Sequence, residues 1–414
     1  MKVDLIIKNA KQILTIQGSE KARIKKEMDN LSIINNGSVV IQNDKIVWVG
    51  KDENLSKEYE SENIIDAKNK VVMPGFVDPH THPVFKDTRE KEFEMRIKGK
   101  TYVEISKAGG GIISSIKGVR DSSEDELYKL AKSRIEKITK LGTTTLEAKS
   151  GYGLNTESEI KMLRVIKRLN QSLPIDIIAT FMGAHEFPPE YKEDKKGYIK
   201  LIKEEMLPIV KNKNLAKYVD IFTEEHVYNI EQSREILQKA KSLGFKLRMH
   251  ADEIEPIGGA ELAGELGAIS ADHLGATSDA GIKKMYENNV IATLLPGTIF
   301  SLGMQSYARA RDLIEAGVPV ALATDYNPGS CNIDSMSTII SLGCIQMKMT
   351  PAEAIVASTF NAACALEMQD QIGSLEVNKK ADIIVLDIPS YQFIPYHLGS
   401  SCVETVIKNG EILF

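Results

Sequence analysis

The most restrictive feature of the sequence is a regular alternation of two kinds of segment between residues 71 and 370. Short apolar runs rich in β-branched residues predict buried strands, and stretches with apolar residues every three or four positions predict amphipathic helices. The strand-like runs are VVMPGFVDPHTH, TTTLEAKSGYG, IDIIATFMGAH, YVDIFTEEH, FKLRMHADE, GAISADHL, VIATLLPG and PVALATD. Eightfold alternation favours a (β/α)8 TIM-type barrel, with a doubly wound open sheet as the competing architecture.

The two ends of the chain have a different pattern. Residues 1–70 and 371–414 contain short β-branched runs separated by Asn, Asp and Gly, which is typical of strands joined by tight turns. The clearest turn signal is Asn409-Gly410, and Asn43-Asp44 is a weaker hairpin signal. Neither end is long enough to form a robust domain alone. We therefore expect one small β-sandwich from residues 1–70 plus 371–414, and a barrel from residues 71–370.

The bulk composition argues against several classes of protein. The 414 residues carry a formal net charge of −5, whereas nucleic-acid-binding proteins usually present a basic surface. No apolar run is long enough to cross a bilayer, and the N-terminal segment is too polar for a signal peptide. The four cysteines form no C-x-x-C pair, so we expect reduced thiols. These features predict a cytoplasmic protein that binds neither nucleic acid nor membrane.

Polar residues gather where the predicted strands end. Six of the seven histidines occupy such positions, namely His80, His82, His185, His226, His250 and His273. In a barrel, the carboxyl ends of all strands form one face, and that face carries the active site. Histidines buried in a core for structural reasons would not collect in this way. The pattern therefore predicts a functional site at the carboxyl ends of the strands.

The first of these strands ends in His80-Thr81-His82. Because strand side chains alternate, His80 and His82 can point to the same side and converge. Converging imidazoles suit a transition metal, and a catalytic site needs one or two further ligands and an open position. His250 and Asp325, at the ends of other strands, are the candidates. Taken singly, H-x-H is a weak motif, His250 could be a core histidine, and Asp325 could be a helix N-cap.

Longer strings in the sequence resemble the amidohydrolase superfamily, and the resemblance covers the whole chain. It rests on PGFVDPHTH, a later strand-end His, the His of SADHL, and ATD. Within the superfamily, the sequence is similar to the branch that opens the ring of 4-imidazolone-5-propanoate in histidine degradation. That closer similarity rests on PHTHPVF with Arg89 after it, the segment from Tyr102 to AGGGI, EAKSGYGL, FMGAHEFPPEY, MHADEI, SADHL and ATDYNPGS.

The resemblance implies one metal ion per chain, zinc or iron, held by His80, His82, His250 and Asp325. The run YVDIFTEEH has no Lys where some relatives carry a carboxylated Lys that bridges two metals, which favours a single metal. The implied reaction is metal-dependent hydrolysis of the ring amide of 4-imidazolone-5-propanoate to N-formimidoyl-L-glutamate. The implied partners are this small-molecule substrate and a second copy of the chain in a homodimer.

Proton transfer in such a reaction needs titratable side chains beside the metal. The candidates are Glu253, His273 and Asp325, and the sequence does not rank them. Glu253 or His273 is the favoured base, and Asp325 is a ligand whose further role as a proton shuttle stays open. The alternative for His273 is a structural role behind the ligands.

The propanoate tail of the implied substrate needs a positively charged partner. Arg89 follows the histidine motif closely, and a forked guanidinium suits a carboxylate. On the string TREKEF alone, a surface arginine would be the better interpretation. The expected substrate-binding residues are Arg89, Tyr102, Tyr152, His185, Glu253, Asn327, Gly329 and Ser330.

Two other functions stay open from the sequence. An aminohydrolase such as a guanine or cytosine deaminase uses similar metal ligands, but a neutral base would give it little use for Arg89. A non-catalytic scaffold of the same fold would have lost its metal ligands, whereas this sequence retains all four candidates.

Overall fold

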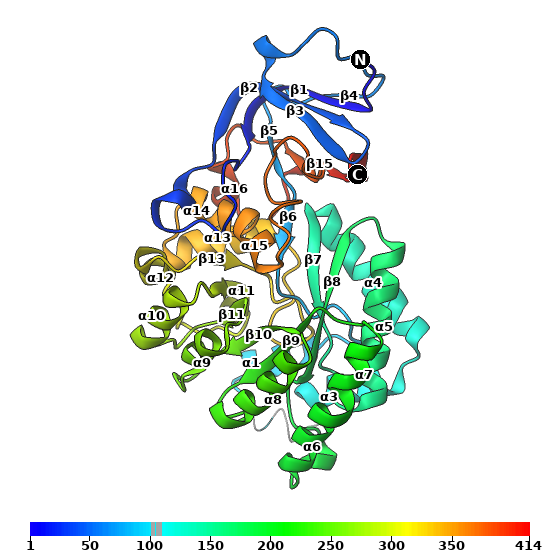
Figure 1. The fold of residues 1–414 in the computed structure, drawn as a ribbon, viewed down its shortest axis with the longest axis vertical. Coiled ribbons are helices and arrows are strands. Elements are labelled where there is room, and N and C mark those ends of the chain that lie inside the picture. The colour runs from blue at the N-terminus through cyan, green and yellow to red at the C-terminus, as the bar shows by residue number, and fades with distance from the viewer. Residues whose placement is uncertain (101–103, 105–109) are drawn as a thin grey trace.

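The structure is a computed structural model that describes residues 1–100, 104 and 110–414. It contains a barrel and a separate sheet built from both termini, which lies above the barrel in Figure 1. The barrel strands are β6 (Phe76–Asp78), β7 (Thr143–Lys149), β8 (Asp176–Ala184), β9 (Tyr218–Thr223), β10 (Lys246–Ala251), β11 (Ser270–His273), β12 (Ile291–Leu294) and β13 (Val320–Leu322). They follow one another in chain order, and each pairs in parallel with the next. The predicted (β/α)8 barrel is confirmed.

Helices cover the outside of the barrel (Figure 1). They are α1 (Glu90–Ile97), α3 (Ile112–Asp121), α4 (Glu124–Lys140), α5 (Thr156–Ser172), η3 (Pro189–Tyr191), α6 (Lys195–Leu201), η4 (Ile202–Met206), α7 (Leu207–Asn212), α8 (Ile230–Ser242), α9 (Gly259–Leu266), α10 (Asp279–Glu287), α11 (Pro296–Ser301), α12 (Ala310–Ala316), α13 (Met336–Met347), α14 (Pro351–Ala357) and α15 (Phe360–Ala365). Helix α4 illustrates why they form. Ser123 caps it by accepting from the Glu126 N–H, and Leu127, Ala131 and Ile135 bury one face.

The terminal sheet joins the first and last parts of the chain. Its strands are β1 (Leu5–Leu14), β2 (Ile33–Gln42), β3 (Lys45–Lys51), β4 (Ile64–Asp66), β5 (Val71–Pro74), β14 (Ile383–Leu386), β15 (Val403–Lys408) and β16 (Glu411–Ile412), and the helices nearby are η1 (Lys25–Asp29), η2 (Asp52–Asn54) and α16 (Phe393–Tyr396). Both predicted hairpins are confirmed, because β2 pairs with β3 and β15 with β16. Residues from both ends of the chain share one hydrophobic core beneath this sheet. The sheet curls around that core, because the Ala381 N–H just before β14 donates to the carbonyl of Asp44, between β2 and β3, at 2.8 Å.

The run VVMPGFVDPHTH differs from the single strand that its apolar pattern predicts. It forms two strands in two sheets, because β5 pairs with β1 and β14 whereas β6 pairs with β7. Gly75 lies between them, where a Cβ would collide with Thr144 and where its N–H donates to the Asp382 carbonyl at 3.0 Å. Because glycine has no Cβ, the chain can pass close to Thr144 here, where it leaves the terminal sheet and enters the barrel.

The barrel is nearly closed by the segments that follow its first and last strands. The Asp325 N–H donates to the His80 carbonyl at 3.1 Å, and the His82 N–H donates to the Tyr326 carbonyl at 2.8 Å. Asp78 strengthens the junction by accepting from the Thr324 N–H at 3.1 Å. The closure therefore brings the histidine motif and Asp325 together.

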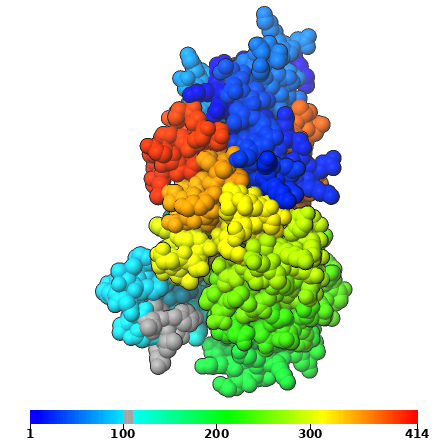
Figure 2. Space-filling view, turned by 90° about the vertical axis from the view of Figure 1, so that its left-hand side faces the viewer, coloured from blue at the N-terminus to red at the C-terminus, as the bar shows by residue number. Residues whose placement is uncertain are grey.

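The boundaries of the two expected domains stay a prediction. Strand β5 already belongs to the terminal sheet, and helices α13, α14 and α15 lie between that sheet and the barrel (Figure 1). Figure 2 shows the segment of α1 and α3, in cyan, projecting from the side of the barrel. In the described part of the chain, no helix has both the length and the apolar character that a bilayer crossing needs.

Candidate metal centre

Three of the predicted ligands converge at the closure of the barrel. The Nε2 atoms of His80 and His82 lie 3.5 Å and 3.6 Å from Oδ1 of Asp325. Ligand atoms about 2.0–2.2 Å from a tetrahedral metal are separated by roughly 3.3–3.6 Å, so this spacing fits a bound ion. All three side chains are buried, and Oδ2 of Asp325 accepts from the Thr298 hydroxyl at 2.6 Å. The geometry fits a three-ligand cradle with Oδ1 of Asp325 directed into it.

His250 approaches the same point from β10. Its ring centroid lies 4.5 Å from that of His80 and 5.7 Å from that of His82. Nδ1 of His250 is 3.1 Å from Asp220, and Nδ1 of His80 is 2.7 Å from Asp272. A carboxylate on Nδ1 fixes the tautomer that leaves Nε2 free to bind a metal. The four side chains proposed as ligands thus lie together.

The donor set also fits a metal by its chemistry. Nε2 of His80 is buried and has no hydrogen-bond partner among the described residues. Burial, with repulsion from Lys149 and His250, holds the pKa of His80 well below its usual value. Burial and the neighbouring histidines lower the pKa of His82 in the same way. Neutral imidazoles and an aspartate are the ligands that zinc and iron accept.

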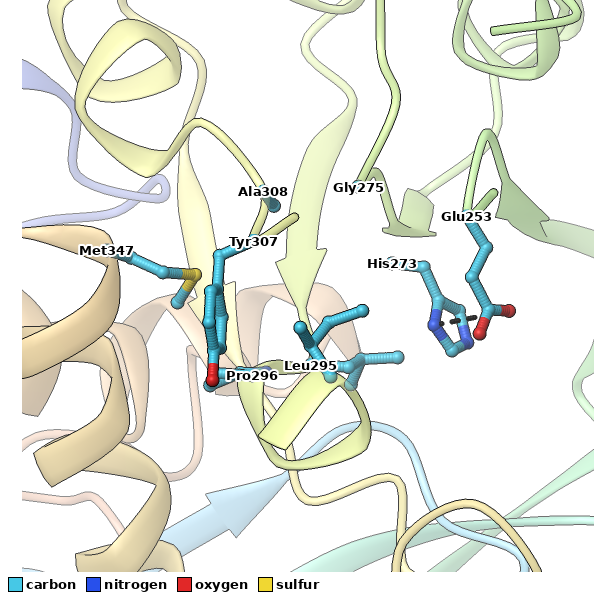
Figure 3. A pocket seen from close by; sticks show the side chains of 9 residues that line it. Glu253, His273, Gly275, Leu295, Pro296, Tyr307, Ala308 and Met347 are labelled. Carbon is cyan, nitrogen blue, oxygen red and sulfur yellow. Dashed lines mark ion pairs between the residues drawn. The ribbon is translucent and has the colours of Figure 1, made fainter. Parts of the chain in front are cut away.

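His273 lies at the end of β11, and two roles are open to it: metal ligand, or proton transfer beside the metal. His80, His250 and His273 can place ligand atoms within 4.8 Å of one another, so His273 is within reach of a metal. Its Nδ1 lies 3.4 Å from Oε2 of Glu253, and the two side chains lie next to each other at one side of a small pocket lined also by Pro296 and Tyr307 (Figure 3). The pairing with Glu253 supports a role in proton transfer.

The pKa values of this pair suit proton transfer near neutral pH. Burial, with repulsion from Asp325, raises the pKa of Glu253 to about 8. Burial, with repulsion from His250, holds the pKa of His273 well below its usual value. At neutral pH in the metal-free protein, Glu253 is therefore largely protonated and His273 is a neutral imidazole. A carboxyl group that titrates near the pH of the cell is matched to acid–base catalysis.

This pKa predicts how pH affects the stability of the metal-free protein. A carboxyl has a pKa near 4.3 when unfolded and Glu253 has one of about 8 when folded, so its protonated form contributes stability that is present in full below about pH 4 and is lost as pH rises toward 8. Metal-free Glu253→Gln should therefore be more stable than wild type at pH 8, by about 1–3 kcal/mol because the side chain keeps some exposure. Urea unfolding at pH 5 and pH 8 measures this, and an equal difference at both pH values would contradict the assignment.

Backbone strain marks the same strand ends. Asp252, His273 and Asp325 have φ of 48°, 76° and 52°, in the left-handed region that residues other than glycine seldom adopt. Such residues cost about 1–3 kcal/mol each and gather at functional sites. These three residues lie at the ends of strands that carry the candidate ligands and proton-transfer groups.

Tyr152 and His185 line the side of the site next to His82. The His82 and His185 rings stack with centroids 5.3 Å apart, and Tyr152 lies 5.3 Å from His185. Nδ1 of His185 lies 3.0 Å from the Gly151 carbonyl. The buried carboxylate of Glu159 holds this loop by accepting from backbone N–H groups, those of Gly151, Gly153 and Leu154 at 2.8–3.1 Å. These hydrogen bonds to Glu159 therefore fix the conformation of the loop that carries Tyr152.

Arg89 lies against the loop after Asp325. Its N–H donates to the Pro328 carbonyl at 3.1 Å, and its guanidinium donates to Glu92 at 2.8 Å and 3.0 Å. A Cβ on Gly329 would collide with that guanidinium, so glycine there provides its space. Within the loop, Oδ1 of Asn327 accepts from the N–H groups of Gly329 and Ser330 at 2.8 Å each. Tyr102 lies outside the described residues.

Comparisons with known proteins show the family of the chain. The family model described as "Amidohydrolase family" matches residues 71–413. The chain belongs to the amidohydrolase family. A relative in Alkaliphilus oremlandii (strain OhILAs) named "Imidazolonepropionase" is 49% identical over 100% of this chain and 98% of its own length. Another of that name in Geobacillus sp. (strain WCH70) is 50% identical over 99% of this chain and 97% of its own.

Solved structures show the same fold at lower identity. An adenosine deaminase from Xanthomonas campestris with bound zinc matches with a TM-score of 0.71 and 19% identity, over 99% of this chain and 93% of that chain. A triazine hydrolase variant matches with a TM-score of 0.75 and 16% identity, over 99% and 94% of the two chains. At these identities the similarity shows the amidohydrolase fold alone.

The candidate metal centre is surrounded by buried charges to which the sequence reasoning gave no role. They come from strand interiors and ends, namely Glu147, Lys149, Asp220, Arg248 and Asp272, and all are buried. The feature of the sequence that could have identified them is a charged residue inside an apolar strand, because burying a charge is energetically unfavourable unless the charge is paired. By contrast His226, which follows β9, is exposed and lies outside the cluster of ligands.

Proposed function

We propose that the protein is an imidazolonepropionase, a hydrolase that opens the ring amide of 4-imidazolone-5-propanoate to give N-formimidoyl-L-glutamate in histidine degradation. The observation that carries the proposal is 49–50% identity to relatives of that name over essentially the whole of both chains. The geometry supports it, because a cradle for a metal, a carboxyl group titrating near neutral pH and a nearby guanidinium lie at one face of the barrel.

His80, His82, His250 and Asp325 would hold one metal ion. A metal bound there lowers the pKa of a coordinated water and polarises the carbonyl to be attacked. Asp220 and Asp272 support this arrangement by holding Nδ1 of His250 and His80. Zinc and iron both accept these ligands, and we propose one of the two as the native ion.

Glu253 is the group we assign to proton transfer. In its ionised form Glu253 can accept a proton from the attacking water and return that proton to the leaving ring nitrogen, and a pKa of about 8 makes that form accessible near neutral pH. A protonated Glu253 that donates to Nδ1 of His273 leaves the His273 Nε2 as an N–H. Nε2 of His273 is buried with no partner among the described residues, so it is available to donate to the oxygen that becomes negative as the carbonyl is attacked.

Arg89 is the residue we assign to the substrate carboxylate. Glu92 orients the Arg89 guanidinium by accepting from Nε and Nη2. The other edge of the guanidinium, which carries Nη1, lies over Gly329 in the loop that also contains Asn327 and Ser330. A charge-assisted pair with a carboxylate stabilises binding by about 1.5–3 kcal/mol. A neutral substrate would gain nothing from it.

Replacing Arg89 tests this assignment. Arg89→Met should raise KM for 4-imidazolone-5-propanoate about 10–100-fold and change kcat much less, because the lost contact is to a part of the substrate that does not react. Steady-state kinetics measure both constants, and Lys91→Met at the exposed neighbouring position is the matched control. An unchanged KM in Arg89→Met would remove Arg89 from the substrate site.

We also propose that the protein works as a homodimer in the cytoplasm. Exposed apolar side chains near α16, including Tyr396 at 82% and Leu398 at 52% exposure, would suit a contact with a second copy. All four cysteines are free, which suits a reducing compartment. Light scattering at micromolar concentration tests the dimer.

The proposed reaction is tested by supplying the purified protein with freshly prepared 4-imidazolone-5-propanoate and following the loss of its absorbance. The reaction is expected to run well above spontaneous breakdown. Guanine and cytosine, assayed by release of ammonia, serve as neutral comparison substrates and should not react. Release of ammonia from either base, with no loss of the imidazolone, would favour a deaminase instead.

A further inference from the structure

A fully buried lysine lies beneath the metal centre, at the end of β7. Nζ of Lys149 is 2.7 Å from Oε1 of Glu147 and 2.8 Å from Oδ2 of Asp220. Nζ also lies 3.9 Å from Oδ2 of Asp272. One ammonium group is thus in contact with carboxylates from three strands, β7, β9 and β11. Each of these side chains has 0% exposure, so the charges interact without screening by water.

Each of these carboxylates contacts a histidine ligand or the backbone beside one. Asp220 lies 3.1 Å from Nδ1 of His250 and accepts from the His250 N–H at 3.2 Å. Asp272 lies 2.7 Å from Nδ1 of His80. Glu147 accepts from the N–H of Thr81, the residue between the two histidines of the motif, at 3.2 Å. Lys149 is therefore linked through these carboxylates to two of the segments that carry the ligands, the His80–His82 motif and the strand of His250.

The buried carboxylates need a cation beside them. Three buried carboxylates in one layer repel one another, and an ammonium placed among them offsets that repulsion, so that the aspartates keep their contacts with Nδ1 of the histidines. Burial by itself would lower the pKa of Lys149, but attraction to Asp220 and Glu147 outweighs it and the pKa is raised. Arg248 is the second buried cation of the layer, but it donates to the carbonyls of Pro79 and Ala365 at 2.8–2.9 Å and lies 3.5 Å from Asp272.

We propose that Lys149 is a positioning residue of the metal centre. Its ammonium holds Glu147, Asp220 and Asp272 where they present His80 and His250 with Nε2 free. The inference rests on the proposed metal centre and goes beyond it, because Lys149 acts through carboxylates and is not itself one of the proposed ligands. It predicts that loss of the ammonium weakens metal affinity about 10–100-fold, the range usual for residues that orient metal ligands.

The chain offers a matched control for the cost of removing a buried lysine. Lys408 in β15 is also fully buried, and its Nζ lies 2.7 Å from Asp176 and 2.6 Å from Asp382. Asp176 begins β8, whereas Lys149 pairs with Thr180 of that strand, so the two clusters are separated by about 13 Å along the barrel. Lys408→Met should therefore lower stability without reaching the metal centre.

The experiment compares Lys149→Met and Lys408→Met in the full chain. Zn²⁺ affinity is measured by competition with a chromophoric chelator, and the d–d spectrum of Co²⁺-loaded protein reports ligand geometry. Melting temperatures of the metal-free forms report the structural cost. Both variants should melt lower than wild type, but only Lys149→Met should lose Zn²⁺ affinity about 10–100-fold and alter the Co²⁺ spectrum. If Lys149→Met does not fold, Lys149→Gln, whose amide can still donate to two carboxylates, takes its place with the same expectation.

The outcomes separate this inference from the proposed function. Wild-type affinity and an unchanged Co²⁺ spectrum in the folded Lys149 variant would overturn the role of Lys149 and leave the metal centre intact. An equal loss of affinity in Lys408→Met would assign the effect to general destabilisation and overturn it as well. Failure of both Lys149 variants to fold beside a folded Lys408→Met would show that Lys149 supports the barrel itself, and would overturn its assignment as a positioning residue of the metal centre. Wild-type protein that binds neither ion would contradict the proposed metal centre and this inference with it.

Discussion

The His82→Ala variant is expected to lose bound metal and to fall in kcat/KM by at least about 10³-fold, because the metal supplies both the activated water and the polarised carbonyl. His82 is the ligand best suited to this test. Its Nε2 points at Asp325, and among the described residues its Nδ1 has no partner, so its removal disturbs little else. Metal content by plasma mass spectrometry and steady-state kinetics on the same preparation give the two results.

The matched control for this variant is His226→Ala. His226 also follows a barrel strand, but it is exposed and its ring lies 6.1 Å from Phe222, outside the cluster of ligands. It should keep metal and activity within about twofold of wild type. Retention of stoichiometric metal by His82→Ala would show that the convergence of His80, His82 and Asp325 is not the binding site.

The Glu253→Gln variant is expected to keep its metal and to lose about 10²–10⁴-fold in kcat, the usual contribution of a general acid–base group. Gln has the shape of the neutral carboxyl but, unlike the ionised form that a pKa of about 8 makes accessible near pH 7, it cannot take a proton from water. The loss should fall on kcat and kcat/KM alike, because proton transfer belongs to the transition state.

Glu225→Gln provides the control for this second variant, since Glu225 is exposed at the end of another barrel strand. Its kinetics should match those of wild type. His273→Gln makes the comparison complete: loss of metal in that variant would assign His273 to the ligands, whereas loss of kcat alone would assign it to proton transfer beside Glu253. Near wild-type kcat in Glu253→Gln would transfer the role of base to His273 or Asp325.

The barrel could be predicted from the sequence because its two periodicities are unambiguous. Helices such as α4 repeat apolar residues along one face, and strands such as β9 are short apolar runs between polar ends. The division of VVMPGFVDPHTH into β5 and β6 could not be predicted, because the apolar pattern continues across Gly75. Only the packing of Thr144 against Gly75 and the pairing of β5 with β1 and β14 separate the two strands.

The candidate site was predictable where its residues follow strands. His80, His82 and Asp325 follow their strands and His250 and His273 end theirs, so their chain positions alone placed them on one face. Other contacts depend on tertiary structure. Nothing in TREKEF shows that Glu92 would orient Arg89, and nothing in TESEIKM shows that Glu159 would hold the Tyr152 loop. Lys149 ends β7 and Asp220 lies within β9, and their pairing with each other depends on how the two strands are placed in the barrel.

The most direct test of the account joins metal to reaction in one assay. Purified protein, untreated or pretreated with a chelator and then resupplied with Zn²⁺ or Fe²⁺, is incubated with 4-imidazolone-5-propanoate, and the product is followed by mass spectrometry. The account predicts N-formimidoyl-L-glutamate from the untreated and resupplied samples, and only the spontaneous background after chelation. Metal-loaded protein that forms no product above that background, or chelated protein that keeps its full rate, would contradict it.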